Sequence, residues 1–200
     1  MPGMRDKRKI GRFVVGISGS PARGGATEAM LDNALDGARS RGARILKVCL
    51  NGLRYRPCQG CGGCLKTGRC VIADDMGPVY ALLKKSDSVI VASPVYFGSI
   101  TAQLKSMLDR LECLWVEANL LRRRPKIRGG RRRGYFICSG GSHREGHFAD
   151  AERMAAIIFN TINVKYSGSL LVKGSDIFAK GAVSSEVMSE AFKMGERSAC

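Results

Sequence analysis

Residues 13–40 read FVVGISGSPARGGATEAMLDNALDGARS, and this stretch decides the fold. The run Phe13–Ile17 has the length and the β-branched content of a buried strand. A loop rich in Gly and Ser follows, and Ala26–Ser40 then carries apolar residues at helical spacing. A buried strand that leads through a glycine-rich loop into a helix predicts the start of a parallel sheet.

The same alternation of strand and helix patterns continues along the rest of the chain. The expected strands are Arg44–Leu50, Ser88–Ala92, Gly134–Cys138 and Tyr166–Val172, and the expected helices are Met76–Lys85, Ile100–Trp115, Phe148–Asn160 and Ser185–Arg197. Because crossovers between parallel strands are right-handed, few topologies remain. We predict an α/β protein with a five-stranded parallel sheet in the order 2-1-3-4-5. One domain is expected to span residues 1–200, with its ligand beyond the carboxyl ends of strands 1 and 3.

Composition narrows the class of protein. Hydrophobic residues make up 44% of the 200 residues, which is enough for one domain with a real core. No apolar run reaches the roughly 18 residues of a membrane span, and the apolar run behind the basic start is too short for a signal peptide. We therefore expect a cytoplasmic protein without a membrane segment. The formal net charge of +16 favours acidic partners without choosing among them.

The loop from Ser18 to Thr27 has the composition of a phosphate cradle. A Gly- and Ser-rich loop ahead of a helix presents free backbone amides and the positive end of the helix dipole, and Ser18, Ser20 and Thr27 add hydroxyl donors. The Gly-Lys-Ser/Thr ending of a P-loop is absent. The second strand ends in CLN (49–51), without the acid of a dinucleotide site. These observations favour a mononucleotide, and an ordinary turn between strand and helix is the alternative.

Two further loops are expected at the same edge of the sheet. The third strand leads into SPVYFGS (93–99), where Pro94 stiffens the turn and Gly98 permits a close backbone approach. Tyr96 and Phe97 can lie against a flat ring, although aromatic residues that merely cover the core would look the same. The fourth strand ends in SGGSH (139–143). We predict that all three loops converge on one crevice.

A cysteine-rich loop is the most distinctive segment of the chain. Cys58, Cys61, Cys64 and Cys70 lie within thirteen residues, with glycines between them that let the backbone turn tightly. Such close spacing is typical of [4Fe–4S] ligation. A Cys₄ zinc site usually pairs two hooks across a longer gap and fits less well. Free or redox-active thiols are the other alternative.

The other four cysteines show no ligand spacing; they are Cys49, Cys113, Cys138 and Cys200. Cys49 and Cys138 lie in expected strands, and we predict that both are buried as small hydrophobic side chains.

The segment from Leu121 to Arg133 carries eight basic residues and no acid. Three interpretations stay open for residues 122–133: a solvated linker, a docking patch for an acidic redox protein such as a ferredoxin, and a nucleic-acid contact. No aromatic residue is interleaved for base stacking, and the chain shows no nucleic-acid-binding motif, so nucleic acid is the weakest of the three.

Three motifs together resemble the NADPH-dependent FMN reductase superfamily, and the cysteine spacing is most similar to its iron–sulfur flavoprotein branch. They are GISGSPARGGAT (16–27), CQGCGGCLKTGRCVIADDM (58–76) and SPVYFGSITAQLKSMLDR (93–110). The resemblance covers roughly residues 13–172. It implies a flavodoxin-like three-layer fold, non-covalent FMN, and a homodimer or a tetramer.

The resemblance also implies site residues. Ser18, Ser20 and Thr27 would hold the FMN phosphate, with Pro21 and Ala26 in the same loop, although Ala26 stands where the family usually has Asn. The residues implied to contact the flavin ring are Pro94, Val95, Tyr96, Phe97, Gly98, Ser99, Ser139, Gly140 and Gly141. Cys58, Cys61, Cys64 and Cys70, in the loop 57–72, would ligate a [4Fe–4S] cluster.

These expectations together describe an electron-transfer flavoprotein. Electrons would pass from a reduced carrier through the cluster to FMN and on to an acceptor, while the protein positions and tunes both groups. The alternative is an NAD(P)H-dependent FMN or quinone reductase without a cluster, in which NAD(P)H is a substrate.

Overall fold

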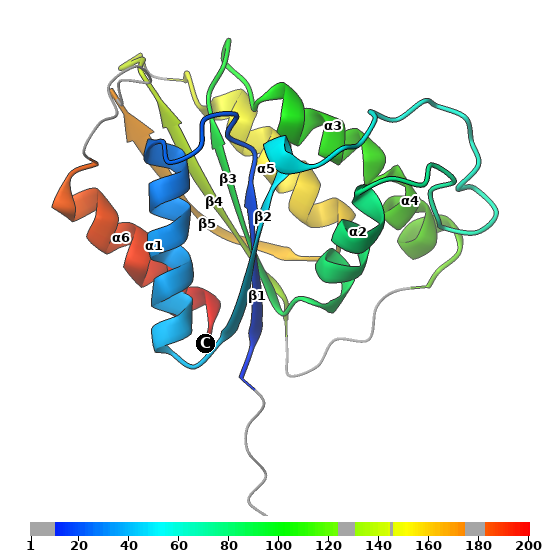
Figure 1. Cartoon of the computed structure of the whole chain (residues 1–200), viewed down its shortest axis with the longest axis horizontal. Helices are drawn as coiled ribbons and strands as arrows, with labels where there is room; N and C mark the ends of the chain where they lie inside the picture. Colours follow the sequence, from blue (N-terminus) through cyan, green and yellow to red (C-terminus); the bar gives the residue numbers. More distant parts are fainter. Residues whose placement is uncertain (1–10, 124–130, 145, 175–182) are drawn as a thin grey trace, which may run out of the picture.

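The computed structural model describes residues 11–123, 131–144, 146–174 and 183–200. One five-stranded parallel sheet has the order β2-β1-β3-β4-β5, which confirms the predicted topology (Figure 1). Its strands are β1 (Phe13–Ser18), β2 (Arg44–Cys49), β3 (Ser88–Pro94), β4 (Arg133–Gly140) and β5 (Lys165–Lys173). The strand order reverses between β1 and β3, and in such sheets ligands bind at this point.

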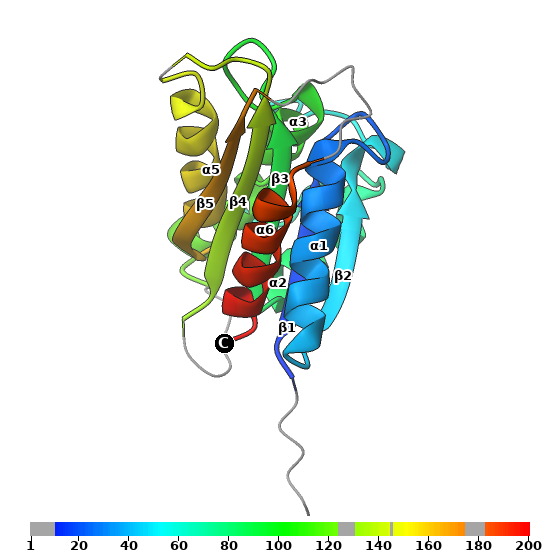
Figure 2. The same ribbon diagram turned by 90° about the vertical axis from the view of Figure 1, so that its left-hand side faces the viewer.

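Helices cover both faces of the sheet. They are α1 (Ala26–Ser40), α2 (Met76–Lys85), α3 (Ala102–Arg110), α4 (Glu112–Trp115), α5 (Ala149–Thr161) and α6 (Ser185–Ser198), with short turns η1 (Leu50–Gly52) and η2 (Val116–Leu120). Helices α1 and α6 lie side by side on one face, and α2, α3 and α5 lie on the other (Figures 1 and 2). The result is the three-layer architecture that strand–helix alternation predicts.

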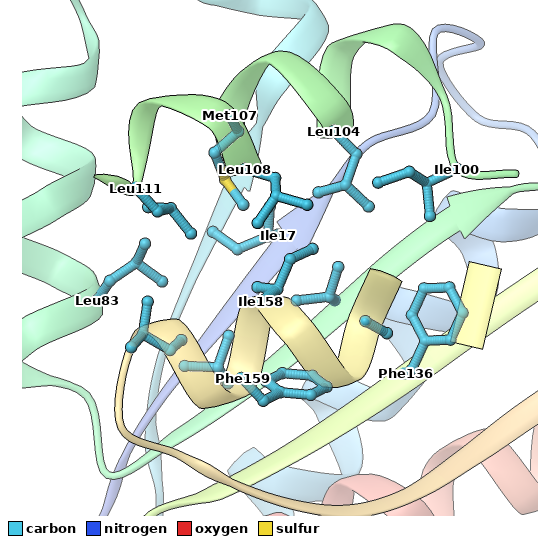
Figure 3. Packing of buried hydrophobic residues seen from close by; sticks show 14 of the residues in the cluster. Ile17, Leu83, Ile100, Leu104, Met107, Leu108, Leu111, Phe136, Ile158 and Phe159 are labelled. Atoms are coloured by element: carbon cyan, nitrogen blue, oxygen red, sulfur yellow. The ribbon is translucent and has the colours of Figure 1, made fainter. Parts of the chain in front are cut away.

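Two hydrophobic cores hold these layers together. Strands β1 and β3 are buried along their whole length, which explains why they read as continuous apolar runs instead of alternating ones. The larger core lies between the sheet and helices α3 and α5, where Ile17, Leu104 and Phe136 are fully buried (Figure 3). The smaller core joins the other face to α1 and α6. Helices packed on both faces hold the sheet in place, and the loops that follow β1, β3 and β4 leave it at its carboxyl edge.

Several element boundaries differ from the prediction. The expected helix Ile100–Trp115 begins at Ala102, because the Thr101 side chain caps it by accepting a bond from the Leu104 amide. This helix also breaks at Leu111, so that α3, α4 and η2 follow one another. Strands β3 and β4 run to Pro94 and Gly140, respectively, which places three predicted site residues, Pro94, Ser139 and Gly140, at strand ends instead of in loops.

The contact between α1 and α6 depends on glycine. A Cβ atom on Gly195 would lie 1.7 Å from the Ala34 carbonyl oxygen, and one on Gly37 would lie 2.1 Å from that of Phe192. Both clashes are with backbone, so the two helices would have to separate. We therefore expect Gly195→Ala to lower the free energy of unfolding by about 1 to 3 kcal/mol, measured by urea denaturation.

The matched control is Gly77→Ala in α2, where an added Cβ meets nothing within 4 Å. There the same substitution is expected to raise the free energy of unfolding by about 0.5 to 1 kcal/mol, because alanine has the higher helix propensity. Shifts of equal sign in the two variants would contradict the close packing of α1 on α6.

Among the described residues, none of the helices combines the length and the apolar character that a bilayer crossing requires.

Candidate functional site

The three loops predicted to converge do so at the carboxyl edge of the sheet (Figure 1). The hydroxyl groups of Thr27 and Ser139 are 2.6 Å apart and buried, which joins the start of α1 to the end of β4. The Val95 amide donates to the Ser139 carbonyl oxygen at 2.8 Å. The start of α1, the residue after β3 and the end of β4, which are far apart in sequence, therefore form one edge site.

The start of α1 provides the predicted cradle. Among the described residues, the backbone amides of Gly25, Ala26 and Thr27 have no acceptor, as expected for the first turn of a helix. The 15-residue helix directs its positive end at them. Amides and dipole together fit a phosphate, and no lysine is needed.

Two donors of the cradle have internal partners. The Ser20 hydroxyl and the Ala22 backbone bond each other within the loop, at 3.2 Å in both directions. The Gly24 amide donates to the Glu28 carboxylate at 2.6 Å. Ser18 is buried, and Pro21 and Ala26 are half-buried. The Pro21 carbonyl oxygen accepts a hydrogen bond from the side-chain amide of Asn51. The open donors of the loop are therefore chiefly backbone amides.

Glu28 is a residue of this site that the sequence analysis missed. Its carboxylate accepts bonds from Lys47 at 3.0 Å and from the Cys49 thiol at 3.3 Å. Burial alone would raise the pKa of Glu28, but its hydrogen bonds to Gly24, Lys47 and Cys49 lower it overall. Cys49 is half-buried and its thiol contacts a carboxylate, so the prediction that it is a buried hydrophobic side chain is wrong. The same prediction is confirmed for Cys138.

A tight turn presents two aromatic residues at the edge site. Tyr96 and Ser99 exchange backbone bonds of 2.9 and 3.1 Å, which forces Phe97 and Gly98 to positive φ angles of 50° and 80°. A positive φ is unfavourable for a bulky side chain. The Phe97 side chain is fully exposed, and Tyr96 is 38% exposed. Both aromatic faces are thereby available to a flat ring instead of covering the core.

Buried hydroxyl groups connect the loops of the edge site. The Thr101 hydroxyl donates to the Gly19 carbonyl oxygen at 2.6 Å, and the Thr101 amide donates to the Ser93 hydroxyl at 3.2 Å. These bonds connect the loops that follow β1 and β3. Position in the sequence gave no indication that Thr101 would have this role.

The cysteine loop forms a second site, beside α2 and α4 in Figure 1. All four predicted ligands, Cys58, Cys61, Cys64 and Cys70, line one cavity of about 320 Å³. Cys58 and Cys61 are exposed, whereas Cys64 and Cys70 are half-buried. Gly60 and Gly62 have φ angles of 62° and 69°, so the tight turns between the cysteines do require glycine.

The lining of this cavity can be compared with the ligands that each kind of metal group requires. A single zinc ion would draw four sulfurs to about 2.3 Å from one point. Within the described ranges, no group of three or more His, Cys, Asp or Glu side chains stands close enough together to hold a metal ion. In a cubane cluster each thiolate binds a different iron. The four thiols that line this cavity of about 320 Å³ match the type and number of ligands that such a cluster needs.

A fifth thiol that the sequence analysis set aside also faces this cavity. Cys113 on α4 is buried and lines the wall with Cys64 and Cys70. Burial raises the pKa of the Cys113 thiol to about 11, so that it is protonated at neutral pH. Burial also raises the pKa of Cys64. Only the three-dimensional structure brings Cys113 to the loop, because it lies far along the chain from Cys58–Cys70.

The two ends of the cysteine loop, its neck, are joined by hydrogen bonds between residues 54–56 and residues 74–75. The Arg54 amide donates to the Asp75 carboxylate at 2.7 Å, and the Arg56 amide donates to the Asp74 carboxylate at 3.2 Å. The Arg110 side chain, fully buried, forms bonds of 2.7 and 3.0 Å to the two oxygens of Asp74. Hydrogen bonding from Arg110 keeps the pKa of Asp74 below its usual value.

The basic segment is only partly described, because residues 124–130 lie outside the described ranges. Arg131 is exposed, but Arg132 is 4% exposed and points into the protein, where it binds carbonyl groups. The interpretation of Arg132 as part of an exposed patch is therefore wrong. The remaining described charges can still serve such a patch.

Comparison with known proteins extends these observations. The chain is 44% identical over 97 residues to an iron–sulfur flavoprotein of Archaeoglobus fulgidus, an alignment that covers 48% of this chain and 44% of the relative. It is 36% identical over 133 residues to an iron–sulfur flavoprotein of Methanosarcina thermophila, which covers 66% of this chain and 65% of the relative. The chain thus spans about half to two thirds of the length of these curated relatives.

Solved structures share the fold. A flavone reductase superposes with a TM-score of 0.68 at 17% identity, over 94% of this chain and 62% of that chain. An NAD(P)H:quinone oxidoreductase from Methanothermobacter marburgensis superposes with a TM-score of 0.67 at 15% identity, over 94% and 98%. The family model for NADPH-dependent FMN reductase matches residues 13–173, which include both sites. The chain belongs to the NADPH-dependent FMN reductase family.

Proposed function

We propose that this protein is an electron-transfer flavoprotein that binds FMN at the edge site and a [4Fe–4S] cluster in the cysteine loop. It would take electrons from a reduced carrier at the cluster and deliver them from FMN to an acceptor. The observation that carries the proposal is the cavity lined by all four cysteines, in a chain whose family binds FMN. Relatives named iron–sulfur flavoproteins support it.

The residues of the edge site would each do a separate part of holding FMN. The amides of Gly25, Ala26 and Thr27, together with the Thr27 hydroxyl, would bind the phosphate, and the turn Tyr96–Ser99 would lie along the ring. Bound FMN supplies one- and two-electron redox chemistry. Glu28 keeps Lys47 beside α1 by an ion pair, so that the negative charge near the phosphate is balanced.

A change at Thr27 tests the phosphate assignment. Thr27→Val keeps the volume and removes the hydroxyl, so we expect the Kd for FMN to rise about tenfold or more, since a hydrogen bond to a charged group contributes about 1.5 to 3 kcal/mol. The affinity for riboflavin, which lacks the phosphate, is expected to stay unchanged. Fluorescence titration of the apoprotein measures both constants.

Ser139→Ala is the matched control for that variant, because it breaks the same Thr27–Ser139 contact from the other side. If Ser139 contacts the ring, as we propose, its loss weakens FMN and riboflavin by the same factor. An equal loss of both ligands in Thr27→Val would contradict a phosphate at the start of α1.

The second candidate function is an NAD(P)H-dependent FMN or quinone reductase without a cluster, which the family itself favours. Rapid oxidation of NADPH by a protein that contains flavin and no iron would support it over the first proposal. The four cysteines around one cavity favour the first.

For the electron donor we propose an acidic carrier such as a ferredoxin. Arg131, Arg133 and Lys165 line a surface hollow of about 420 Å³, whose remaining lining residues are Tyr135, Tyr166 and Ser167. Three cations in one hollow, on a chain with a net charge of +16, favour an acidic surface. The homodimer or tetramer implied by the family resemblance stays a prediction.

A further inference from the structure

The cysteine loop is held at its neck by one buried side chain from another element. Arg110, in the last turn of α3, is bonded to both oxygens of Asp74. It also donates to the Arg56 carbonyl oxygen at 2.7 Å and to the Tyr80 hydroxyl at 3.1 Å. Arg56 precedes Cys58 by two residues and Asp74 follows Cys70 by four. One guanidinium group is therefore hydrogen-bonded to both ends of the loop that carries the four thiols.

The guanidinium group of Arg110 is fully buried beside the cavity and interacts electrostatically with Cys70. Arg110 lines the cavity together with Cys58, Cys61, Cys64 and Cys70. The only other charged residue of that lining is Glu112, which is exposed to solvent. Water screens an exposed charge much more than a buried one. Of the charges at this cavity, the least screened is thus that of buried Arg110, which is bonded to the carboxylate of Asp74.

Resting on the function proposed above, we propose that Arg110 is a positioning residue that sets the reduction potential of the cluster and, through Asp74 and Arg56, the spacing of its ligands. Reduction adds negative charge to a cluster, and the potential depends on nearby charge and hydrogen bonds. A buried cation beside the cavity favours the reduced form, and the carboxylate that is bonded to it has the opposite effect. The two partners therefore shift the potential in opposite directions.

Opposite shifts of the cluster potential in two variants distinguish this role from a merely structural one. In Arg110→Met the carboxylate is left alone, and the cluster potential is expected to fall. At the wild-type midpoint the ratio of reduced to oxidised cluster should drop at least about tenfold, which is about 59 mV for one electron. In Asp74→Asn the guanidinium is left alone, and the potential is expected to rise. The double variant Arg110→Met/Asp74→Asn is expected between the two.

The measurement is a redox titration of the full-length, anaerobically purified protein, followed by electron paramagnetic resonance, with iron per chain and FMN per chain recorded for each variant. Arg69→Gln is the matched control: it removes one charge within the loop from an exposed side chain, and its potential should match the wild type. FMN content is expected to be equal in all variants, because no residue of the edge site lines the cavity.

Shifts of the same sign in Arg110→Met and Asp74→Asn, or no shift in either, would overturn the inference. If Arg110→Met retains too little iron for titration, Asp74→Asn decides: a raised potential supports the inference, and an unchanged or lowered one overturns it. Wild-type protein that binds no iron would overturn the proposed function, and this inference with it. If the wild type binds the cluster and neither substitution changes its reduction potential, the inference alone would be overturned.

Discussion

Purified without oxygen, the Cys61→Ser variant is expected to lose the iron and sulfide of the cluster and to keep FMN. Cys61 is exposed and lines the cavity with the other three predicted ligands. A serine hydroxyl is a much poorer ligand than a thiolate for this metal group, so the cubane would lack one of its four supports. The edge site lies elsewhere and shares no residue with that cavity. Colorimetric iron and sulfide assays and the absorbance of released FMN measure both contents.

Cys200→Ser is the control for a general effect of removing a thiol. Cys200 is exposed, lies at the end of the chain and takes no part in the cavity. This variant should contain as much iron and FMN as the wild type. Iron content in Cys61→Ser equal to that in Cys200→Ser would show that the ligand assignment is wrong.

The largest loss of stability is expected from Arg132→Met. The Arg132 guanidinium donates to the Ser86 carbonyl oxygen at 2.8 Å and to the Ile162 carbonyl oxygen at 2.6 Å, and it also bonds the Leu83 carbonyl. These oxygens lie at the carboxyl ends of α2 and α5, where a cation is favourable. Burial lowers the pKa of Arg132 to about 10, so the group stays charged at neutral pH.

Methionine can fill the space of Arg132 but cannot donate to the carbonyl groups; that of Leu83 keeps the Ser86 hydroxyl as a donor at 3.2 Å, whereas those of Ser86 and Ile162 lose the Arg132 bond. Each buried acceptor left without a donor costs about 1 to 3 kcal/mol, and the added apolar contact offsets part of this. We expect the free energy of unfolding to fall by about 3 to 5 kcal/mol in urea denaturation. Arg131→Met, a change at the exposed neighbour, is expected to stay within about 0.5 kcal/mol of the wild type. Equal midpoints in these two variants would contradict the structural role of Arg132.

The sheet order and the edge site could be predicted because local patterns carry them. Phe13–Ile17 and Ser88–Ala92 are buried on both faces, so their sequences are apolar without interruption. The glycines before α1 are typical of a loop that leaves the first amides of a helix free, as they are here. Chain connectivity then brings Thr27 and Ser139 to one edge of a parallel sheet, and their hydroxyl groups do meet there.

Other features could not be predicted, because they depend on contacts between distant segments. Arg132 belongs to a run of basic residues, and nothing in that run indicates which member turns inward. Cys113 and Arg110 reach the cysteine cavity only because α3 and α4 pack beside the loop. Cys49 sits in a strand of ordinary composition, yet Glu28 from α1 makes its surroundings polar. In each case a partner far away in sequence decides the role of the residue.

The central claim is that one chain holds both FMN and a [4Fe–4S] cluster. The most direct measurement is the content of FMN, iron and sulfide in the full-length protein after anaerobic purification, with the visible spectrum recorded before and after dithionite. We expect about one FMN and about four iron and four sulfide per chain, with flavin bands above a broad absorption that dithionite bleaches. Protein that contains FMN without iron, or that does not bind FMN supplied in excess, would contradict it.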